Sequence, residues 1–191
     1  MAVIYQTTLV PSKLELLTAW LPRQDWYQGQ PGGPSLAKVG GFRLDDPAGQ
    51  VGIEFMVVRD DAAREVTAYL VPMTYRDAAL PGADARRIGT AEHGVLGLRW
   101  IYDGTQDPVL VAQLAELIRG RVQAQAQSQS DTPDATIRAT PVAAPRFAID
   151  FERVLKPAPA DSVPGQVTGP WTAPDGMVIR SVLAAARPLL D

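Results

Sequence analysis

A chain of 191 residues that is 46% hydrophobic and 20% charged is long and apolar enough to bury the core of one domain, which argues against wholesale disorder. Its formal net charge of −3, from 18 basic and 21 acidic side chains, gives no electrostatic basis for binding nucleic acid or an anionic membrane. The absence of cysteine excludes disulfides, thiol catalysis and cysteine-based zinc sites, and is typical of a reducing compartment.

The N-terminal segment, residues 1–10, is rich in β-branched and aromatic side chains and predicts a strand. It lacks a charged region followed by a long apolar stretch, so we expect no secretory signal. No apolar run approaches the roughly 20 residues of a membrane-spanning helix. These observations predict a cytoplasmic protein that does not contact a membrane.

A first helix is predicted by Ser12 and Glu15, which have the spacing of a capping box. Leucines recur at helical spacing from Leu14 onward, and the helix should end before Pro22. The glycine- and proline-rich residues 28–34 that follow predict a loop.

Three strands are predicted over residues 35–44, 51–58 and 65–75, because connectors rich in turn-forming residues separate these stretches. The spacing favours antiparallel neighbours. Pro72 cannot donate to a ladder, so we expect an edge or a bulge there. Residues 87–102 predict one or two further strands.

A second helix is predicted to begin at Asp107-Pro108 and to end at Gly120. Residues 123–130 are of low complexity and predict a helix extension or a linker. The remaining stretches predict strands at 135–140, 146–155 and 177–183, with a proline-crowded loop at 156–175.

Together these elements predict an α+β fold built on an antiparallel sheet, because strands that follow one another without helices argue against a doubly wound parallel fold. We expect a single domain over residues 1–191, with a linker within 121–133. Residues 134–191 should add strands to the same domain, since they contain too little apolar material to fold alone.

Several motifs in this order resemble the N-terminal cap family of actinobacterial maltokinases and the related glucosamine kinases, with the best match over residues 14–120. The first motif places a helix-ending tryptophan six residues before a second one, and further matches are residues 69–76, 88–94 and 100–104. The first motif reads Trp20-Leu21-Pro22-Arg23-Gln24-Asp25-Trp26-Tyr27.

The resemblance implies a curved antiparallel sheet with flanking helices, an arrangement described as cystatin-like. It also implies a domain that packs against the nucleotide-binding region of a kinase without holding the catalytic residues. Enzyme members tend to have a basic residue where Asp25 stands, and another near Gln30. The sequence ends at Asp191, where a full kinase continues for a larger catalytic portion. We therefore expect a stand-alone, cap-like module with no cofactor, metal or phosphotransfer machinery.

A magnesium-binding motif of kinases is spelled by residues 149–152, but phosphoryl transfer also needs a base-bearing loop and groups that hold the phosphates. The family kinases carry His-Gly-Asp before the metal-binding aspartate, whereas the one histidine here, His93, is far from it. Apolar residues alternate from Phe147 to Phe151, as in a half-buried strand. We interpret the motif as a coincidence.

Other chemistry-bearing residues also have plain structural interpretations. His93 lacks partners at metal-ligand spacing, and it is interpreted as a surface or packed histidine. Residues 29–34 match no phosphate-binding loop, and their two prolines lack the donors that such a loop needs. The acidic pairs Asp45-Asp46 and Asp60-Asp61 lie between strands and are expected to be solvated.

The large aromatic side chains Trp20, Trp26 and Trp100 are interpreted either as core packing or as a patch that faces a partner or stacks on carbohydrate. Tyr75 and Arg76 end a predicted strand. Together with His93, these five residues make the candidate partner or ligand surface.

Three hypotheses of function remain open. The first is a non-catalytic module that acts in trans, either on an actinobacterial sugar kinase or glycogen-metabolism enzyme, or as a homodimer. The second is a protein that binds a sugar or nucleotide on the concave face of its sheet. The third is an enzyme with a novel site that pairs His93 with a carboxylate.

Overall fold

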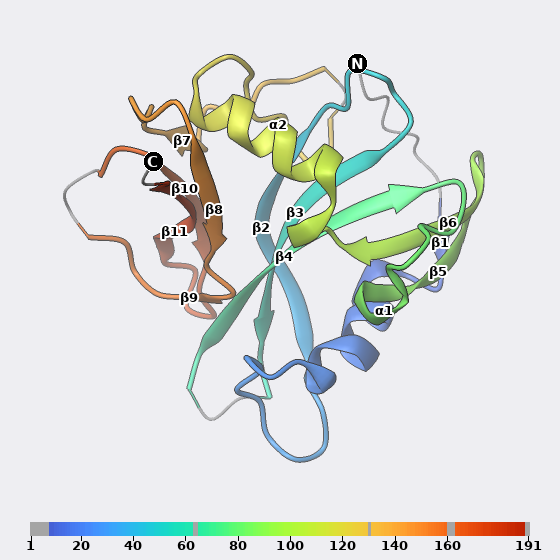
Figure 1. The fold of residues 1–191 in the computed structure, drawn as a ribbon. Helices are drawn as coiled ribbons and strands as arrows, with labels where there is room; N and C mark the ends of the chain where they lie inside the picture. Colours follow the sequence, from blue (N-terminus) through green and yellow to red (C-terminus); the bar gives the residue numbers. More distant parts are fainter. Residues whose placement is uncertain (1–7, 63–64, 130, 160–162, 190–191) are drawn as a thin grey trace.

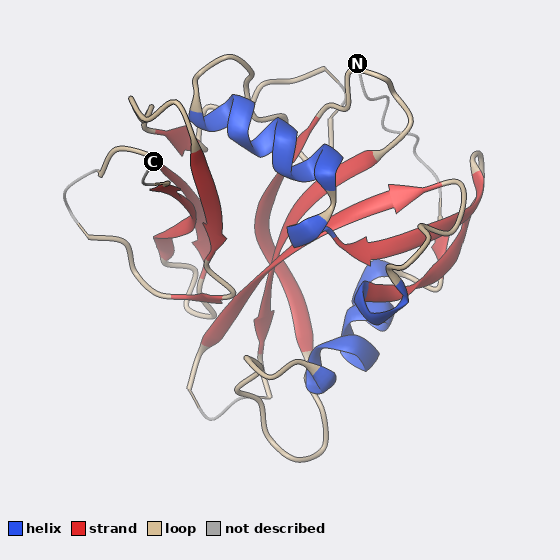
Figure 2. Ribbon diagram, in the orientation of Figure 1, coloured by secondary structure: helices blue, strands red, loops and turns tan. Residues whose placement is uncertain are grey.

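The computed structural model describes residues 8–62, 65–129, 131–159 and 163–189. Within these ranges the chain forms a curved, antiparallel sheet of 11 strands with two helices, α1 (Lys13–Trp20) and α2 (Pro108–Ile118), so the predicted α+β fold is confirmed (Figure 2). The strands are β1 (Leu9–Val10), β2 (Leu36–Leu44), β3 (Gly52–Asp60), β4 (Thr67–Arg76), β5 (Arg87–His93), β6 (Gly97–Asp103), β7 (Arg138–Ala139), β8 (Phe147–Phe151), β9 (Val154–Leu155), β10 (Gln166–Thr172) and β11 (Val178–Pro188). Short 3-10 turns lie at η1 (Leu21–Arg23), η2 (Asp84–Arg86) and η3 (Gly104–Gln106).

Both helices begin where their capping residues predicted. The Ser12 hydroxyl accepts from the Glu15 backbone N–H at 3.3 Å, and the Glu15 carboxylate accepts from the Ser12 N–H at 2.8 Å. Asp107 caps α2 by accepting from the Val109 N–H at 3.0 Å. Helix α1 ends at Trp20, and the chain continues through Pro22 as the turn η1.

The centre of the sheet is buried on both faces. The neighbours run in the order β1-β5-β6-β4-β3-β2-β10-β11-β8, and β3 is buried from Ile53 to Val58. Ile53 and Phe55 join the core cluster that contains the apolar face of α2, while Met56 and Val58 join the cluster that contains α1. Because successive strand residues point to opposite faces, β3 serves both cores.

Strands β2 and β10 are paired at one position among the described residues, that of Gly40 with Trp171. Strands β10, β11 and β8 therefore lie beside the central strands and share the core cluster of α2 (Figure 1). A Cβ at Gly40 would lie 2.6 Å from the Pro170 carbonyl oxygen, and one at Gly41, whose φ is +126°, would overlap the Phe55 carbonyl oxygen. Glycine is required at both positions, because β2 approaches β10 on one side and β3 on the other.

The second edge of β4 is shared by two strands. Strand β6 pairs with Met73–Arg76, and β9 pairs with Ala68 and Tyr69. Pro72, which cannot donate, lies in the interval between them, as an edge position predicts.

The prediction of a loop over residues 156–175 is wrong, because β10 lies within it. Pro170 is tolerated since it falls between the two short pairings of that edge, with β7 at Val167 and Thr168 and with β2 at Trp171. Val167 and Trp171 are buried, so their packing favours the strand despite the surrounding prolines.

Residues 121–129 do not extend α2. Gln125 and Arg43 exchange two backbone hydrogen bonds of 2.9 Å, which attaches this segment to the end of β2. Among the helices described, none is long and apolar enough to cross a bilayer.

Candidate functional site

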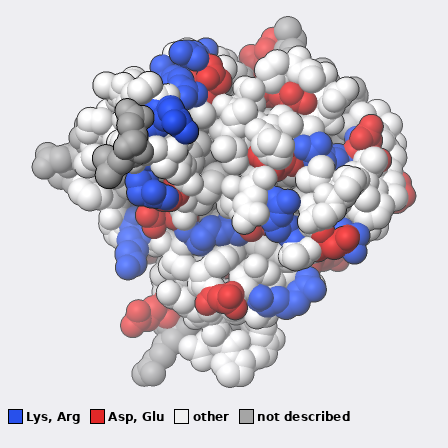
Figure 3. Space-filling model, viewed as in Figure 1, with Lys and Arg blue, Asp and Glu red and all other residues white. Residues whose placement is uncertain are grey.

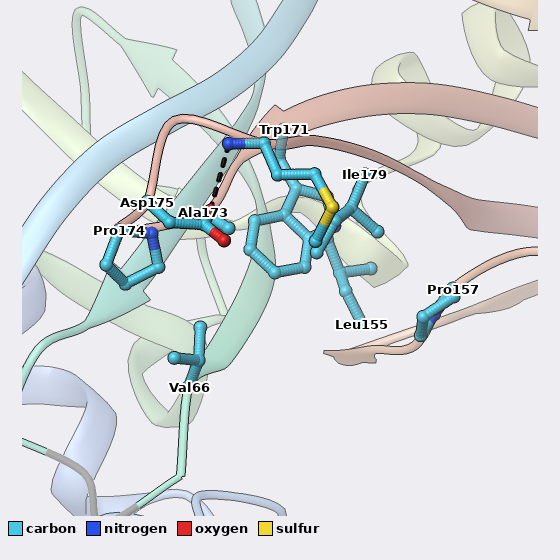
Figure 4. Close-up of a pocket in the computed structure, with 9 residues that line it drawn as sticks. Val66, Leu155, Pro157, Trp171, Ala173, Pro174, Asp175 and Ile179 are labelled. Carbon is cyan, nitrogen blue, oxygen red and sulfur yellow. Dashed lines mark hydrogen bonds between the residues drawn. The ribbon is translucent and has the colours of Figure 1, made fainter.

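An apolar pocket of about 390 Å³ opens between the start of β4, strand β9 and the β10–β11 hairpin (Figure 4). Its volume falls within the range of small-molecule sites. Nine residues line it: Val66, Leu155, Pro157, Trp171, Ala173, Pro174, Asp175, Met177 and Ile179.

The floor of the pocket is built on Trp171. Its indole Nε1–H donates to the Ser181 hydroxyl at 2.9 Å, and both side chains are buried. Because this is the only donor of the indole, its polar edge is satisfied inside the fold, and the six-membered ring faces the pocket beside Leu155 and Ala173 (Figure 4).

The mouth of the pocket is formed by exposed side chains. Val66 and Met177 are more than half exposed at its rim. Asp175 is the one ionisable residue of the lining, and its Oδ1 accepts from the Met177 N–H at 2.9 Å. The Ala173 N–H donates to the Met177 carbonyl at 2.9 Å and closes the hairpin turn that carries Asp175.

The tryptophans of the first motif pack within the fold. Trp20 is buried against the sheet, and Trp26 lies 5.8 Å from it and 5.9 Å from Tyr69, measured between ring centroids. The Arg153 guanidinium lies 4.4 Å from the Trp26 ring centroid and pairs with Asp103 at 2.6 Å. This motif therefore fixes the segment after α1 to the sheet. On the face of the molecule shown in Figure 3, basic and acidic side chains are interspersed.

The prediction of solvated acidic pairs is wrong for Asp60 and Asp46, which are both buried. Asp60 accepts from the Tyr27 hydroxyl and the Ser35 N–H, each at 2.9 Å. Burial and this hydrogen bond raise the pKa of Tyr27. Asp46 accepts from three N–H groups of its own turn. Buried turns need acceptors for their backbone donors, and the composition of a turn does not reveal which carboxylate supplies them.

A buried carboxylate that sequence reasoning missed lies beneath the first turn of α1. Glu54 is 3% exposed and accepts from Lys13 Nζ and the Tyr75 hydroxyl, each at 2.6 Å, and from Gln127 Nε2 at 3.0 Å. Burial opposes ionisation, but the Lys13 ammonium and these hydrogen bonds lower the pKa of Glu54 overall. Burial and the neighbouring Glu54 raise the pKa of Tyr75. The arrangement holds an ionised carboxylate and a neutral phenol, and it anchors α1.

Arg76 is used to anchor α2. Its guanidinium donates two hydrogen bonds to the Asp107 carboxylate, at 2.9 and 2.7 Å, and Thr74 donates a third at 2.9 Å. Burial raises the pKa of Asp107, but these donors lower it overall. Asp107 therefore caps α2 and also binds Arg76 and Thr74 of β4, which attaches the helix to the sheet.

The outward face of β1, β5 and β6 carries exposed apolar side chains. Register places Leu98 opposite Glu92, and Glu92 opposite Val10, so the three side chains share one face. Trp100 lies two residues from Leu98 on the same face, with the Arg87 guanidinium 5.4 Å from its ring centroid. We call Val10, Val95, Leu96, Leu98 and Trp100 the hairpin face.

His93 shapes the tip of this hairpin. Its Nδ1 accepts from the N–H groups of Val95 and Leu96, at 3.3 and 3.1 Å. Burial and the nearby cations Arg99 and Lys13 lower its pKa. In the described part of the chain, no three potential metal-ligating side chains come together. Asp150 lies on β8, a strand as predicted, and pairs with Arg187 at 2.9 Å.

The structure thus divides the candidate surface residues into separate places. Trp20 and Trp26 contact one another in the α1 core. Arg76 and Trp100 are cross-strand partners, and Tyr75 precedes Arg76 but points to the Glu54 side. His93 lies at the far end of β5.

Comparison with known proteins adds two results. No curated protein matches the chain. Residues 20–107, a little under half of the sequence, match the family described as the maltokinase N-terminal cap domain. They run from the end of α1 to the cap of α2 and include the central strands β2, β3 and β4 with the β5–β6 hairpin. The family predicted from the sequence motifs is therefore the one that matches, and residues 20–107 of this chain are similar to its maltokinase N-terminal cap domain.

Proposed function

We propose that this chain is a non-catalytic, cap-like module of the actinobacterial cytoplasm that packs in trans on a protein of sugar metabolism. The partner would be a sugar kinase or a glycogen- or maltose-metabolism enzyme. The match to the cap family supports the class of module. The observation that carries the proposal is the hairpin face, because its β5–β6 residues fall within the matching segment.

The hairpin face has the properties of a contact surface. Its four aliphatic side chains are between 43% and 63% exposed and gather at one end of the sheet. Contiguous exposed apolar patches mark interaction sites, because each Å² of apolar area removed from water contributes about 25 cal/mol. Trp100 adds a large ring, with the Arg87 guanidinium 5.4 Å from its centroid, and aromatic side chains of this kind often anchor interfaces.

Four other candidate surface residues make contacts within the fold. Trp20, Trp26 and Tyr75 are engaged inside the fold, and Arg76 holds Asp107. These contacts hold the strands next to the hairpin, so Leu98 and Trp100 are presented by a fixed strand, whereas Val95 and Leu96 lie in the β5–β6 turn. Rigid presentation lowers the entropic cost of association.

The test compares two exposed apolar positions on different hairpins. Tagged wild-type chain, Leu98→Asp and the control Val178→Asp are used to capture partners from the lysate of the source organism. We expect the wild type and Val178→Asp to retain a sugar kinase or glycogen-metabolism enzyme that Leu98→Asp loses. Binding to the purified partner should weaken at least about tenfold in Leu98→Asp, as for the centre of an interface.

Two other outcomes have defined meanings. Capture that survives Leu98→Asp, or capture of no sugar-metabolism protein at all, would contradict the proposal. Light scattering measures the oligomeric state and so tests whether the partner is a second copy of the chain. A dimer in the wild type that becomes a monomer in Leu98→Asp would identify the second copy as the occupant of the hairpin face.

A further inference from the structure

We propose that the pocket at the β10–β11 hairpin binds a small organic cation with an aromatic or compact apolar body. This site is distinct from the hairpin face, and the proposal does not rest on the proposed function. In Figure 1 the β10–β11 hairpin and the β5–β6 hairpin lie on opposite sides of the molecule.

The volume of the pocket limits the size of the ligand. Liquid water occupies about 30 Å³ per molecule, so 390 Å³ holds about a dozen non-hydrogen atoms. That number corresponds to one aromatic ring with a short side chain. A nucleotide or a disaccharide exceeds this volume and would extend out of the mouth of the pocket.

The lining selects an apolar body. Eight of its nine residues are apolar, and the polar edge of Trp171 is already bonded to Ser181. The pocket thus offers a ring, two prolines and aliphatic side chains, with few groups to replace the hydration of a sugar. Removing hydroxyl groups from water without such replacements is unfavourable, so a sugar should bind poorly here.

The charge at the mouth selects a cation. Asp175 supplies the one ionisable side chain of a lining that also contains Trp171, and the Met177 N–H holds its carboxylate in the hairpin turn (Figure 4). An ammonium group bound in the pocket would be attracted by the carboxylate and by the π face of the indole. Both interactions favour positive charge, and an anionic ligand would be repelled.

The test uses three probes of similar shape and different charge on the intact chain. These are 2-phenylethylamine, 2-phenylethanol and phenylacetate at pH 7. Binding is measured by NMR, from shifts of the indole N–H and backbone N–H signals of the ¹⁵N-labelled protein. We expect the amine to bind tightest, with saturable shifts at Trp171, Ala173 and Met177. Phenylacetate should bind most weakly.

Three variants separate charge from shape. Asp175→Asn keeps an oxygen that can accept from the Met177 N–H, and it should weaken amine binding by about threefold to tenfold without affecting the alcohol. Val66→Trp, at the exposed rim, should block both probes. Leu98→Asp, on the hairpin face, should bind like the wild type.

The proposal is overturned if no probe gives saturable shifts at the pocket, or if phenylacetate binds as tightly as the amine. Binding that Val66→Trp leaves unchanged would place the probe elsewhere and overturn it as well. Since Leu98→Asp is the loss-of-binding variant for the hairpin face and the control here, failure of one proposal does not mimic failure of the other.

Discussion

The Arg153 guanidinium lies over the face of Trp26, 4.4 Å from its ring centroid, and so connects two segments that are far apart in the sequence. Arg153 lies between β8 and β9, whereas Trp26 follows α1. Because the same guanidinium pairs with Asp103 at the end of β6, one side chain spans the interval at which β4 changes partners from β9 to β6.

Removing the Arg153 side chain should lower the free energy of unfolding more than removing a more exposed arginine that makes similar contacts. We expect Arg153→Ala to lower the free energy of unfolding by about 2–3 kcal/mol, because Arg153 and Asp103 are each 13% exposed and an uncompensated charge remains. Arg119→Ala is the control. Its guanidinium lies over Phe147 and pairs with Glu116, but both members of that pair are 30% exposed, so the loss should be under about 1 kcal/mol. Urea denaturation measures both, and equal losses would refute the argument.

The buried Glu54 should make stability depend on acid. Its pKa in the folded chain is lower than its ordinary value of 4.5, so its contribution is complete above that value and is lost as the pH falls through the folded-state pKa. The stability difference between the wild type and Glu54→Gln should therefore shrink between pH 6 and pH 3. Lys13→Met should shift the acid transition to higher pH, because burial then dominates. A difference that does not vary with pH would contradict this account.

Two glycine substitutions should differ strongly in cost. Gly41 has a φ of +126°, and a Cβ there would overlap the Phe55 carbonyl oxygen, so Gly41→Ala should lose about 3 kcal/mol or more. Gly49 also has a positive φ, +69°, but nothing lies within 4 Å of the place that an alanine Cβ would take, so Gly49→Ala should lose about 1–2 kcal/mol. Thermal unfolding of the two variants measures the difference, which should vanish if the close approach of Gly41 to β3 is not required.

The hydrogen bond between Trp171 and Ser181 should show coupling in a double-mutant cycle. Ser181→Ala leaves the buried indole N–H without a partner and should cost about 1–3 kcal/mol. In a Trp171→Phe background, which lacks that N–H, the same serine substitution should cost much less. Additive losses in chemical denaturation would show that the bond contributes nothing specific.

The sequence predicted the elements whose signals are local. The capping box at Ser12 and Glu15 and the Asp107-Pro108 pair fix helix starts through neighbouring residues, and both were confirmed. Strand β10 was missed because Pro170 argues against a strand unless the gap between its two partners is known.

The candidate sites depended on contacts between distant segments. The residues next to Glu54 in the sequence do not indicate that Lys13, Tyr75 and Gln127 surround its side chain. In the pocket, Val66 and Leu155 are almost ninety residues apart in the sequence. The tryptophan motif identified the family correctly, but its spacing did not distinguish packing from recognition. Burial of Trp20 and the ring contacts of Trp26 supply that distinction.

The layer of β10, β11 and β8 covers apolar side chains of the segment that matches the family. Residues 20–107 contain the central strands, yet Phe42, Phe55 and Leu70 on one face are covered by α2 and by this layer, which follow the segment in the chain. A fragment that ends at residue 107 would expose these apolar side chains to solvent. The boundaries of the family match are therefore narrower than those of the shared apolar core, in which later residues cover side chains of the matching segment.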